Sequence, residues 1–406
     1  MRSVSGMRFM LALCLAGGTL AAVPAAAQAP TAATAHLPRE ERTALAALQA
    51  ALAARDYGTA ASALSAAQAA VHSEDGRYYL TNLQFQYARE TNNLPLQTST
   101  IDALIANGRT SPTELGQLYA LRGTLAVYAG EREPAERAFT KALDLAPSAD
   151  TALALAQVKY SLRKNVEALG LIDRAVQMRA ATGAPAPESW YKRGVEIGVS
   201  AAQRPQAIRL STQLVAAYPT PENWRDAVLV YRDFNKGDAA SAVDAVRLLR
   251  ATRALAGERD YLDAAQIFTA AGLPGEAKAV LAEGVAAHMV DPVKATYKEA
   301  IVSANGLAAT DRAKLAAMRT AASKSAAAAA AAGDHMLSFG DYAGAAAAYR
   351  AALQQGGADA DAVNLHLGEA LALGGNRAEA ASALQAVTGP RSEIAALWLA
   401  FAARAA

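Results

Sequence analysis

The sequence predicts an all-α fold in which about ten helix pairs stack one on another and a last single helix closes the array. Trp190 and Trp224 open similar stretches 34 residues apart. The chain is 53% hydrophobic but only 6% aromatic, and it is rich in alanine, the best helix former. No stretch shows the alternating pattern of a strand. One such unit cannot bury its own apolar side, so we expect each pair to pack on its chain neighbours alone.

Residues 1–27 have the parts of a secretory signal peptide. Arg2 and Arg8 precede an apolar run over residues 9–23, and Ala25-Ala26-Ala27 offers the small residues that signal peptidase accepts. We expect cleavage after Ala27, which makes the mature protein periplasmic or secreted. Cys14 is not expected to carry a lipid, because Leu13 before it is too large for a lipobox. Removal of this one cysteine excludes disulfides and thiolate zinc sites in the mature chain.

Residues 28–39 are predicted to be a flexible tether rich in proline, alanine and threonine, and residues 40–404 a helical array without a domain linker. We expect no membrane-spanning helix in this part. Turn signals separate the pairs, and two of them also predict helix starts. Ser111 precedes Pro112 and Asp291 precedes Pro292, so a capping oxygen stands ahead of a proline at the first helical position. The alanine run at residues 326–332 falls where a first helix is expected.

Small residues recur at fixed spacing within the pairs. Gly123 lies midway along one first helix, Gly130 ends that helix, Ala135 marks the crossing of the second helix, and Phe139 fills the space beside it. Similar sets follow at Gly333, Gly340, Ala345 and Tyr349, at Gly368, Gly375, Ala380 and Leu384, and more loosely at Ala265, Gly272, Ala277 and Leu281. These units resemble tetratricopeptide repeats. The resemblance implies a right-handed superhelical solenoid whose first helices line a concave groove.

Other units follow this pattern less closely. Lys164-Asn165 stands where a small hinge residue is usual, and Ala207 comes one residue late in the unit of Trp190. Residues 292–303 and 311–322 are recognised as a pair by their rhythm alone. The resemblance covers most of residues 40–404.

No pattern of catalysis, cofactor binding or metal binding occurs in the sequence, so we expect no enzyme, no cofactor and no metal. The five histidines lack the spacing of a helical metal site, and phosphate-binding glycine loops and nucleophile elbows are absent. Glu369 lies three residues after His366, which we interpret as a pair on a helix surface. With 39 basic and 37 acidic residues, the chain has no basic stripe for nucleic acid.

The resemblance places the binding residues on the first helix of each pair, at positions not used for packing. Tyrosine and arginine there offer contact area together with hydrogen bonding. The candidate groove residues are Gln84, Tyr87, Gln117, Tyr128, Gln157, Tyr160, Tyr191, Arg225 and Arg232.

Three classes of function are left open. The first is a non-catalytic periplasmic or secreted scaffold that binds a protein or peptide in the groove. The second is a separate helical subunit of an envelope polysaccharide export or synthesis system, whose outer-membrane members resemble this chain in repeat type. The third, a superhelical enzyme such as a lytic transglycosylase, is disfavoured because no segment outside the repeats is long enough for a catalytic module.

Overall fold

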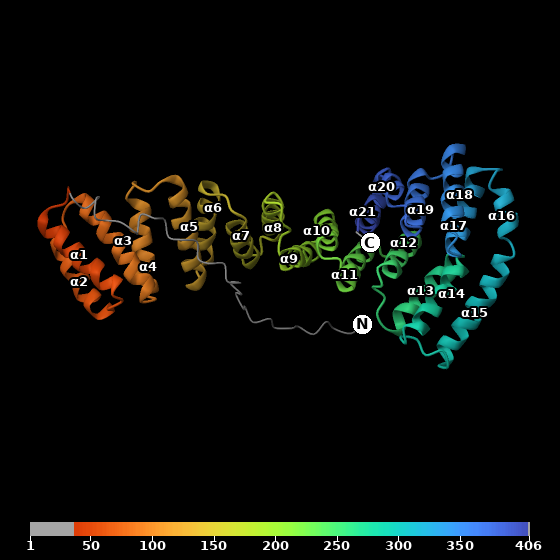
Figure 1. The fold of residues 1–406 in the computed structure, drawn as a ribbon, viewed down its shortest axis with the longest axis horizontal. Coiled ribbons are helices and arrows are strands. Elements are labelled where there is room, and N and C mark those ends of the chain that lie inside the picture. The colour runs from red at the N-terminus through yellow and green to blue at the C-terminus, as the bar shows by residue number, and fades with distance from the viewer. Residues whose placement is uncertain (1–35, 405–406) are drawn as a thin grey trace. The chain divides into compact units, whose positions relative to one another are not determined.

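A computed structural model describes residues 36–404, which contain helices and no strand (Figure 1). The signal peptide, its cleavage site, Cys14 and most of the tether lie outside these residues. The helices fall into two compact units, divided after Leu162, which are described separately. The helices of the first unit are α1 Arg39–Ala53, α2 Tyr57–Ala70, α3 Glu74–Glu90, α4 Leu94–Ala106, α5 Pro112–Tyr128, α6 Arg132–Leu145 and α7 Ala149–Ser161.

The second unit contains the remaining helices. They are α8 Asn165–Ala180, α9 Glu188–Ser200, α10 Arg204–Ala217, α11 Pro221–Phe234, α12 Ala239–Ala251, α13 Glu258–Ala270, α14 Pro274–Ala286, α15 Ala295–Arg312, α16 Leu315–Ala321, α17 Ala326–Ser338, α18 Tyr342–Gln355, α19 Ala360–Leu373, α20 Arg377–Gln385 and α21 Ser392–Ala402. In chain order, α1 to α20 make ten helix–turn–helix pairs in the described residues, and α21 follows alone. The predicted all-α repeat fold is confirmed, while the handedness of a superhelix stays a prediction.

A turn residue in the left-handed region joins the two helices of most pairs. Gly130 has φ 75° and Gly340 has φ 74°, a region that glycine enters without steric cost. Less regular pairs place other residues there, among them Arg163 with φ 61° and Ala202 with φ 53°. An alanine with at most 1% exposure follows the turn residue after five positions in seven pairs: Arg55 and Ala60, Gly130 and Ala135, Arg163 and Ala168, Ala202 and Ala207, Gly272 and Ala277, Gly340 and Ala345, Gly375 and Ala380.

The spacing of five residues between the turn residue and the buried alanine revises two expectations. The hinge after α7 is Arg163, immediately before the Lys164-Asn165 that the sequence analysis singled out. Ala207 holds the same place relative to its turn as Ala135 does, so the extra residue of that unit lies in its first helix. Because the turn sets where the second helix begins, it defines the repeat more consistently than the tryptophans do.

The helices of a pair touch where the sequence predicted their crossings. A Cβ atom on Gly123 would lie 2.8 Å from Phe139 Cδ1, and one on Gly333 would lie 2.6 Å from Tyr349 Cε1. Ala135 and Ala345 are fully buried beside these aromatic rings. The first and second helices therefore approach so closely that only hydrogen fits at the glycine positions.

The two predicted proline starts have different outcomes. At α5, the Ser111 hydroxyl accepts a hydrogen bond from the Glu114 backbone N–H, and the Glu114 carboxylate accepts one from the Ser111 backbone N–H. The start at Asp291-Pro292 is wrong, because α15 begins only at Ala295. Asp291 instead accepts a hydrogen bond from the Val293 N–H in a turn. Helix α15 then continues to Arg312, beyond the predicted break of its pair, and leaves α16 only seven residues.

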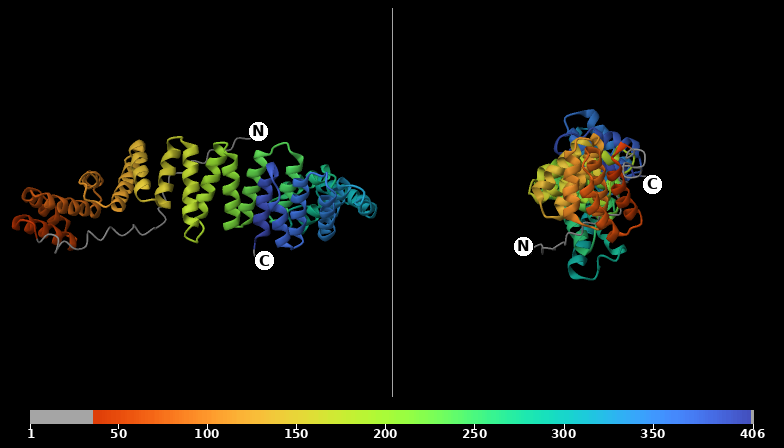
Figure 2. Two further views of the ribbon diagram at one scale, coloured as in Figure 1. Left: turned by 90° about the horizontal axis from the view of Figure 1, so that it is seen from above. Right: turned by 90° about the vertical axis from the view of Figure 1, so that its left-hand side faces the viewer.

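The second unit folds back on itself. After α15 and α16 the chain reverses, so that α21 packs on α10 and α12, and α17 packs on α14 (Figures 1 and 2). Trp224 of α11 meets Phe401 edge to face, with ring centroids 6.4 Å apart, and Phe401 meets Trp398 in the same way. Arg204 donates two hydrogen bonds of 2.8 and 3.0 Å to Glu393 of α21.

The expectation that each pair packs on its chain neighbours alone is therefore wrong for this unit. One continuous core joins residues around Trp224 with residues around Trp398. The physical reason is the apolar surface left on α10 to α14 and on α17 to α21, which buries more area face to face than either set could bury alone.

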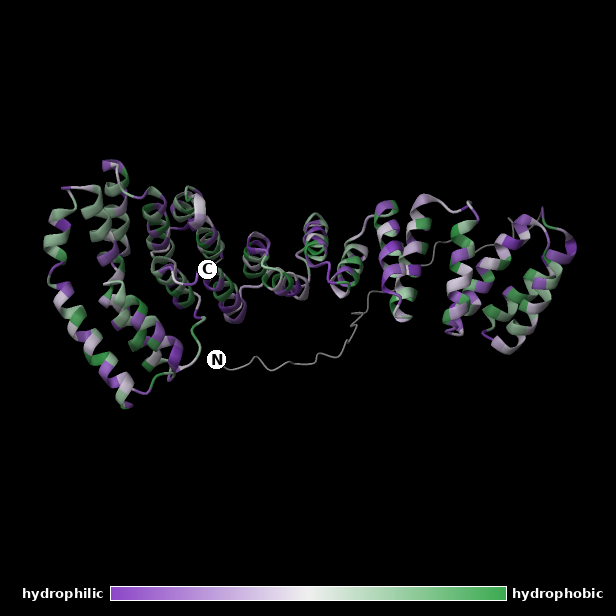
Figure 3. Ribbon diagram, turned by 180° about the vertical axis from the view of Figure 1, so that it is seen from behind, coloured by the Kyte–Doolittle hydropathy of each residue, from purple (hydrophilic) through white to green (hydrophobic). Residues whose placement is uncertain are grey.

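Most helices carry both hydrophobic and hydrophilic residues along their length, as expected when one side packs and the other meets water (Figure 3).

The alanine run lies in α17 as predicted, with Ala326, Ala329 and Ala332 buried. Of the helices in residues 36–404, none combines the length and apolarity needed to cross a membrane.

Gly123→Ala should lower the free energy of unfolding of the first unit by about 1–2 kcal/mol. The added methyl group collides with the Phe139 ring, and overpacking of this kind outweighs the better helix propensity of alanine. Denaturant melts followed by circular dichroism measure the change.

Gly58→Ala in α2 is the matched control. Its Cβ would meet only Asp56 Oδ1 at 3.6 Å, an ordinary contact, so the same substitution should leave stability unchanged or raise it by up to about 0.5 kcal/mol. Equal effects of the two substitutions would contradict the close crossing.

Candidate functional site

Six of the predicted groove residues lie on first helices of the first unit. Gln84 and Tyr87 are half-buried on α3, and Tyr87 packs partly against the core of α1 to α3. On α5, Gln117 is exposed and Tyr128 is 56% exposed. On α7, Gln157 is exposed and Tyr160 is half-buried with a contact of its own. The strongest aromatic candidate is therefore Tyr128.

Helix α5 is packed on two sides. Gly116 and Gly123 are buried against α6, and Leu125 is buried in a core with Phe85 of α3 and Leu104 of α4. Gln117, Ala120, Thr124 and Tyr128 follow one another at steps of three and four residues, which places them on one helix face. We call these four residues the α5 face. Ala120 and Thr124 are half-buried, and the Thr124 hydroxyl donates to the Ala120 carbonyl at 3.0 Å.

Among the described helices of the first unit, no fold-back like that of the second unit covers this face. Its extensive helix contacts join helices at most two positions apart in the chain, from α1 with α2 to α6 with α7. The α5 face thus keeps an exposed aromatic ring beside amide and hydroxyl groups, a combination typical of protein-binding surfaces.

The other three predicted residues lie in the second unit, where their roles are largely structural. Tyr191 is only 4% exposed, and its hydroxyl accepts a hydrogen bond from the Ala186 N–H, so its prediction as an exposed groove residue is wrong. The helical offset used in the sequence analysis assigned Tyr191 to the accessible side of α9, whereas Tyr191 lies on the packed side. Arg225 forms an ion pair with Asp260 and donates to the Ala254 carbonyl at 3.2 Å, which ties α11 to the next pair.

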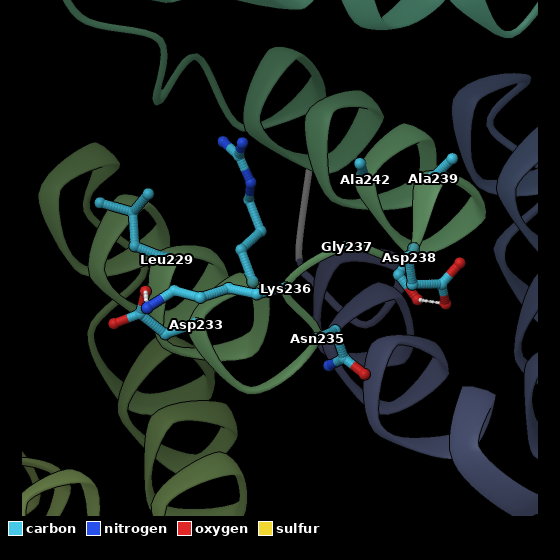
Figure 4. Close-up of a pocket in the computed structure, with 10 residues that line it drawn as sticks. Leu229, Asp233, Asn235, Lys236, Gly237, Asp238, Ala239 and Ala242 are labelled. Carbon is cyan, nitrogen blue, oxygen red and sulfur yellow. Dashed lines mark hydrogen bonds and ion pairs between the residues drawn. The ribbon is translucent and has the colours of Figure 1, made fainter.

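Arg232 lines a surface pocket of about 470 Å³ at the turn between α11 and α12 (Figure 4). Asp233 and Lys236 form an ion pair of 3.0 Å at its rim. Asp238 caps α12 by accepting from the Ala240 N–H, and Tyr231 donates to Ser241. Because these polar groups already bond to one another, the pocket offers Arg232 and little else to a ligand.

The second unit also contains a cluster of charged side chains that the sequence analysis did not identify. We call it the buried polar centre: Asp244 and Arg247 of α12, Glu276 of α14, Asp334 of α17, and His366 and Glu369 of α19. Arg247 donates to both oxygens of Glu276 at 2.8 and 2.9 Å and to Glu369 Oε2 at 3.1 Å. Its side chain is 2% exposed. This guanidinium therefore connects the two helix layers that the fold-back brings together.

His366 lies at the accessible edge of the buried polar centre. Its Nδ1 donates to Asp334 Oδ1 at 2.8 Å, and the Tyr349 hydroxyl donates to the same oxygen at 2.7 Å. Its Nε2 lies 3.3 Å from Asp244 Oδ1. The interpretation of His366 and Glu369 as a surface pair is wrong, because Glu369 is fully buried. The spacing did place both on one face of α19, but that face meets α12 and not water.

Burial and charge act against each other in this centre. Burial and the nearby Asp244 raise the pKa of Glu369 to about 8, although Arg247 and His366 oppose the shift. Burial lowers the pKa of His366, but Asp244 and Asp334 outweigh it and raise that pKa well above its usual value. Asp244, His366 and Glu369 bring three possible metal-ligand atoms within 4.8 Å of one another.

Arg247→Met should destabilise the second unit by about 3–5 kcal/mol, because it leaves Glu276 and Glu369 buried without their cation. Thermal and denaturant unfolding measure the loss.

Arg250→Met, three residues along the same helix, is the control for this prediction. Arg250 pairs with Glu283 at 2.7 Å, but its side chain is 24% exposed and that of Glu283 is 47% exposed. Such a pair contributes about 1 kcal/mol or less. A loss for Arg247→Met no greater than that for Arg250→Met would show that the buried centre does not hold the layers together.

No protein-family model and no curated protein matches the chain. Among solved structures, it is similar to a tetratricopeptide repeat protein from Parabacteroides merdae, with 13% identity, a TM-score of 0.28, and coverage of 63% of this chain and 98% of that one. The TPR2AB domain of yeast Sti1, solved in complex with pHSP90, has 14% identity and a TM-score of 0.32 over 65% and 98% of the two chains. The C-terminal part of a TPR protein from Cytophaga hutchinsonii has 13% identity and a TM-score of 0.30 over 69% and 96%.

Proposed function

We propose that this chain is a non-catalytic scaffold that binds a protein or peptide segment on the first helices of its first unit, with the α5 face at the centre of the site. The observation that carries the proposal is Tyr128, a large aromatic side chain that is 56% exposed at a predicted groove position. Exposed tyrosines supply contact area with little loss of side-chain freedom, so they commonly anchor a partner.

The arrangement of the second unit supports the choice of the first. There the helices α17, α19 and α21 are occupied by contacts with α10, α12 and α14. Of the predicted residues in that unit, Tyr191 is buried and Arg225 is paired. The α5 face keeps hydrogen-bonding groups and an aromatic ring, and it holds no acid–base pair. Its chemistry therefore favours recognition over catalysis.

Site-specific photo-crosslinking tests this function. A photoreactive amino acid in place of Tyr128 should form a covalent adduct with a protein when the chain is produced in its own cells. The control is the same replacement at Lys141, which is exposed on the second helix α6 and should give no adduct. Tyr128→Ala should then weaken binding of the captured partner by about 2 kcal/mol.

The outcomes separate the first two classes of function, the scaffold and the subunit of a polysaccharide system. A secreted or periplasmic protein or peptide captured at Tyr128 supports the scaffold, whereas a component of envelope polysaccharide export would favour the second class. Adducts at Lys141 alone, or none at either position, would reject binding through the α5 face.

We propose further that the protein is exported and cleaved after Ala27, because small residues at Ala25 and Ala27 follow the apolar run. The intact mass of the mature protein should correspond to a chain that begins at Gln28. An Ala27→Arg variant should accumulate uncleaved, since the peptidase pocket accepts only small residues there. A diacylglyceryl adduct on Cys14, or a full-length wild-type chain in exporting cells, would overturn this proposal.

A further inference from the structure

One carboxylate oxygen in the buried polar centre, Glu369 Oε1, has no hydrogen-bond partner, and the Glu369 side chain is 0% exposed. Asp244 Oδ1 makes no hydrogen bond of good geometry, but it lies 3.3 Å from His366 Nε2 and 3.9 Å from an Arg247 nitrogen. A bound ion is one explanation for a buried polar atom without a partner. Asp244, His366 and Glu369 each place one possible ligand atom within 4.8 Å of the other two.

His366 is oriented as a metal ligand would be. The hydrogen bond from Nδ1 to Asp334 holds the ring and turns Nε2 toward Asp244, where a metal ion would take the place of the Nε2 proton. Asp334 is held in turn by the Tyr349 hydroxyl. A carboxylate behind a histidine is the usual outer support of a metal-bound imidazole.

We propose that Asp244, His366 and Glu369 form a binding site for one divalent transition-metal ion of the Zn²⁺ class, between α12 and α19. Asp244 Oδ1, His366 Nε2 and Glu369 Oε1 are its ligands. Glu369 can serve because Arg247 bonds to its other oxygen, Oε2. The two carboxylates balance the charge of the ion, and the imidazole nitrogen selects Zn²⁺ over Mg²⁺ or Ca²⁺, which prefer oxygen ligands alone.

The site is accessible and needs only a small adjustment. The side chain of His366 is 23% exposed, so one of the three ligand residues reaches the surface, and water would complete a tetrahedral site. Tetrahedral zinc at about 2.1 Å from each ligand requires ligand atoms roughly 3.4 Å apart. The ligand atoms lie within 4.8 Å of one another, so each has to move toward the centre of the group by about 1 Å or less to reach that spacing.

The ion would join the two layers of the second unit, since Asp244 lies on α12 and the other ligands lie on α19. A ligand that binds only the folded chain stabilises it in proportion to its concentration over its dissociation constant. Zinc should therefore raise the melting temperature, and a chelator should reverse the change.

Calorimetric titration of ZnCl₂ into the chelator-treated full chain tests the proposal. We expect one equivalent to bind, with a matching rise in melting temperature and a visible Co²⁺ spectrum of a low-symmetry site. Glu369→Gln keeps the size of the side chain and should weaken binding by more than about 100-fold, whereas Asp334→Asn, behind the histidine, should weaken it by about 10–100-fold. Circular dichroism checks that both variants are folded.

His288→Ala is the matched control, because His288 is exposed in the same unit and should make no difference to the titration. Unchanged binding by folded Glu369→Gln, or loss of binding in His288→Ala, would place the zinc elsewhere and overturn the site. Failure of wild type to bind Zn²⁺, or tighter binding of Mg²⁺ or Ca²⁺, would overturn the assignment of the ion.

Discussion

The close crossing of two helices within a pair, as at Gly123 and Gly333, is the constraint on which much of this structure depends. There the first helix needs glycine because an aromatic ring of the second helix lies against it, and a buried alanine stands one turn before that ring. The left-handed turn residue sets the entry of the second helix, so the alanine must come five positions later. Where the turn holds Arg163 or Ala202, neighbouring contacts must offset about 1–2 kcal/mol of backbone strain.

The two units use the same pair in different ways. In the first unit, pairs pack mainly on their chain neighbours and leave the α5 face accessible. In the second, α15 extends past its expected end and α16 is short, and the chain then reverses so that later first helices cover earlier second helices. Helix faces that stay accessible in the first unit are thereby converted into core in the second.

Closure of the second unit places charge in its interior. Replacing Arg247 and its partners with apolar residues would avoid the desolvation of several ions, so the buried polar centre is poorly explained as a source of stability alone. The charged groups instead specify how α12, α14 and α19 are aligned along one another. Each oxygen of Glu276 has its own donor on Arg247, and a shift of one helix would break these hydrogen bonds. Glu369 Oε1 is the atom of this centre that intrachain hydrogen bonds leave unsatisfied.

The sequence by itself determined most of the helices, the ten pairs in chain order and the crossings at Gly123 and Gly333, because these depend on periodicity, turn residues and side-chain size over about 35 residues. It also placed Tyr128 and Gln117 on an accessible face. It misplaced the start and end of α15. Tertiary structure alone decided that Tyr191 is core, that Glu369 is buried, and that His366 faces Asp244 from 122 positions along the chain. Contacts between such distant residues arise only when the chain reverses after α15, and no local pattern encodes which buried faces then meet.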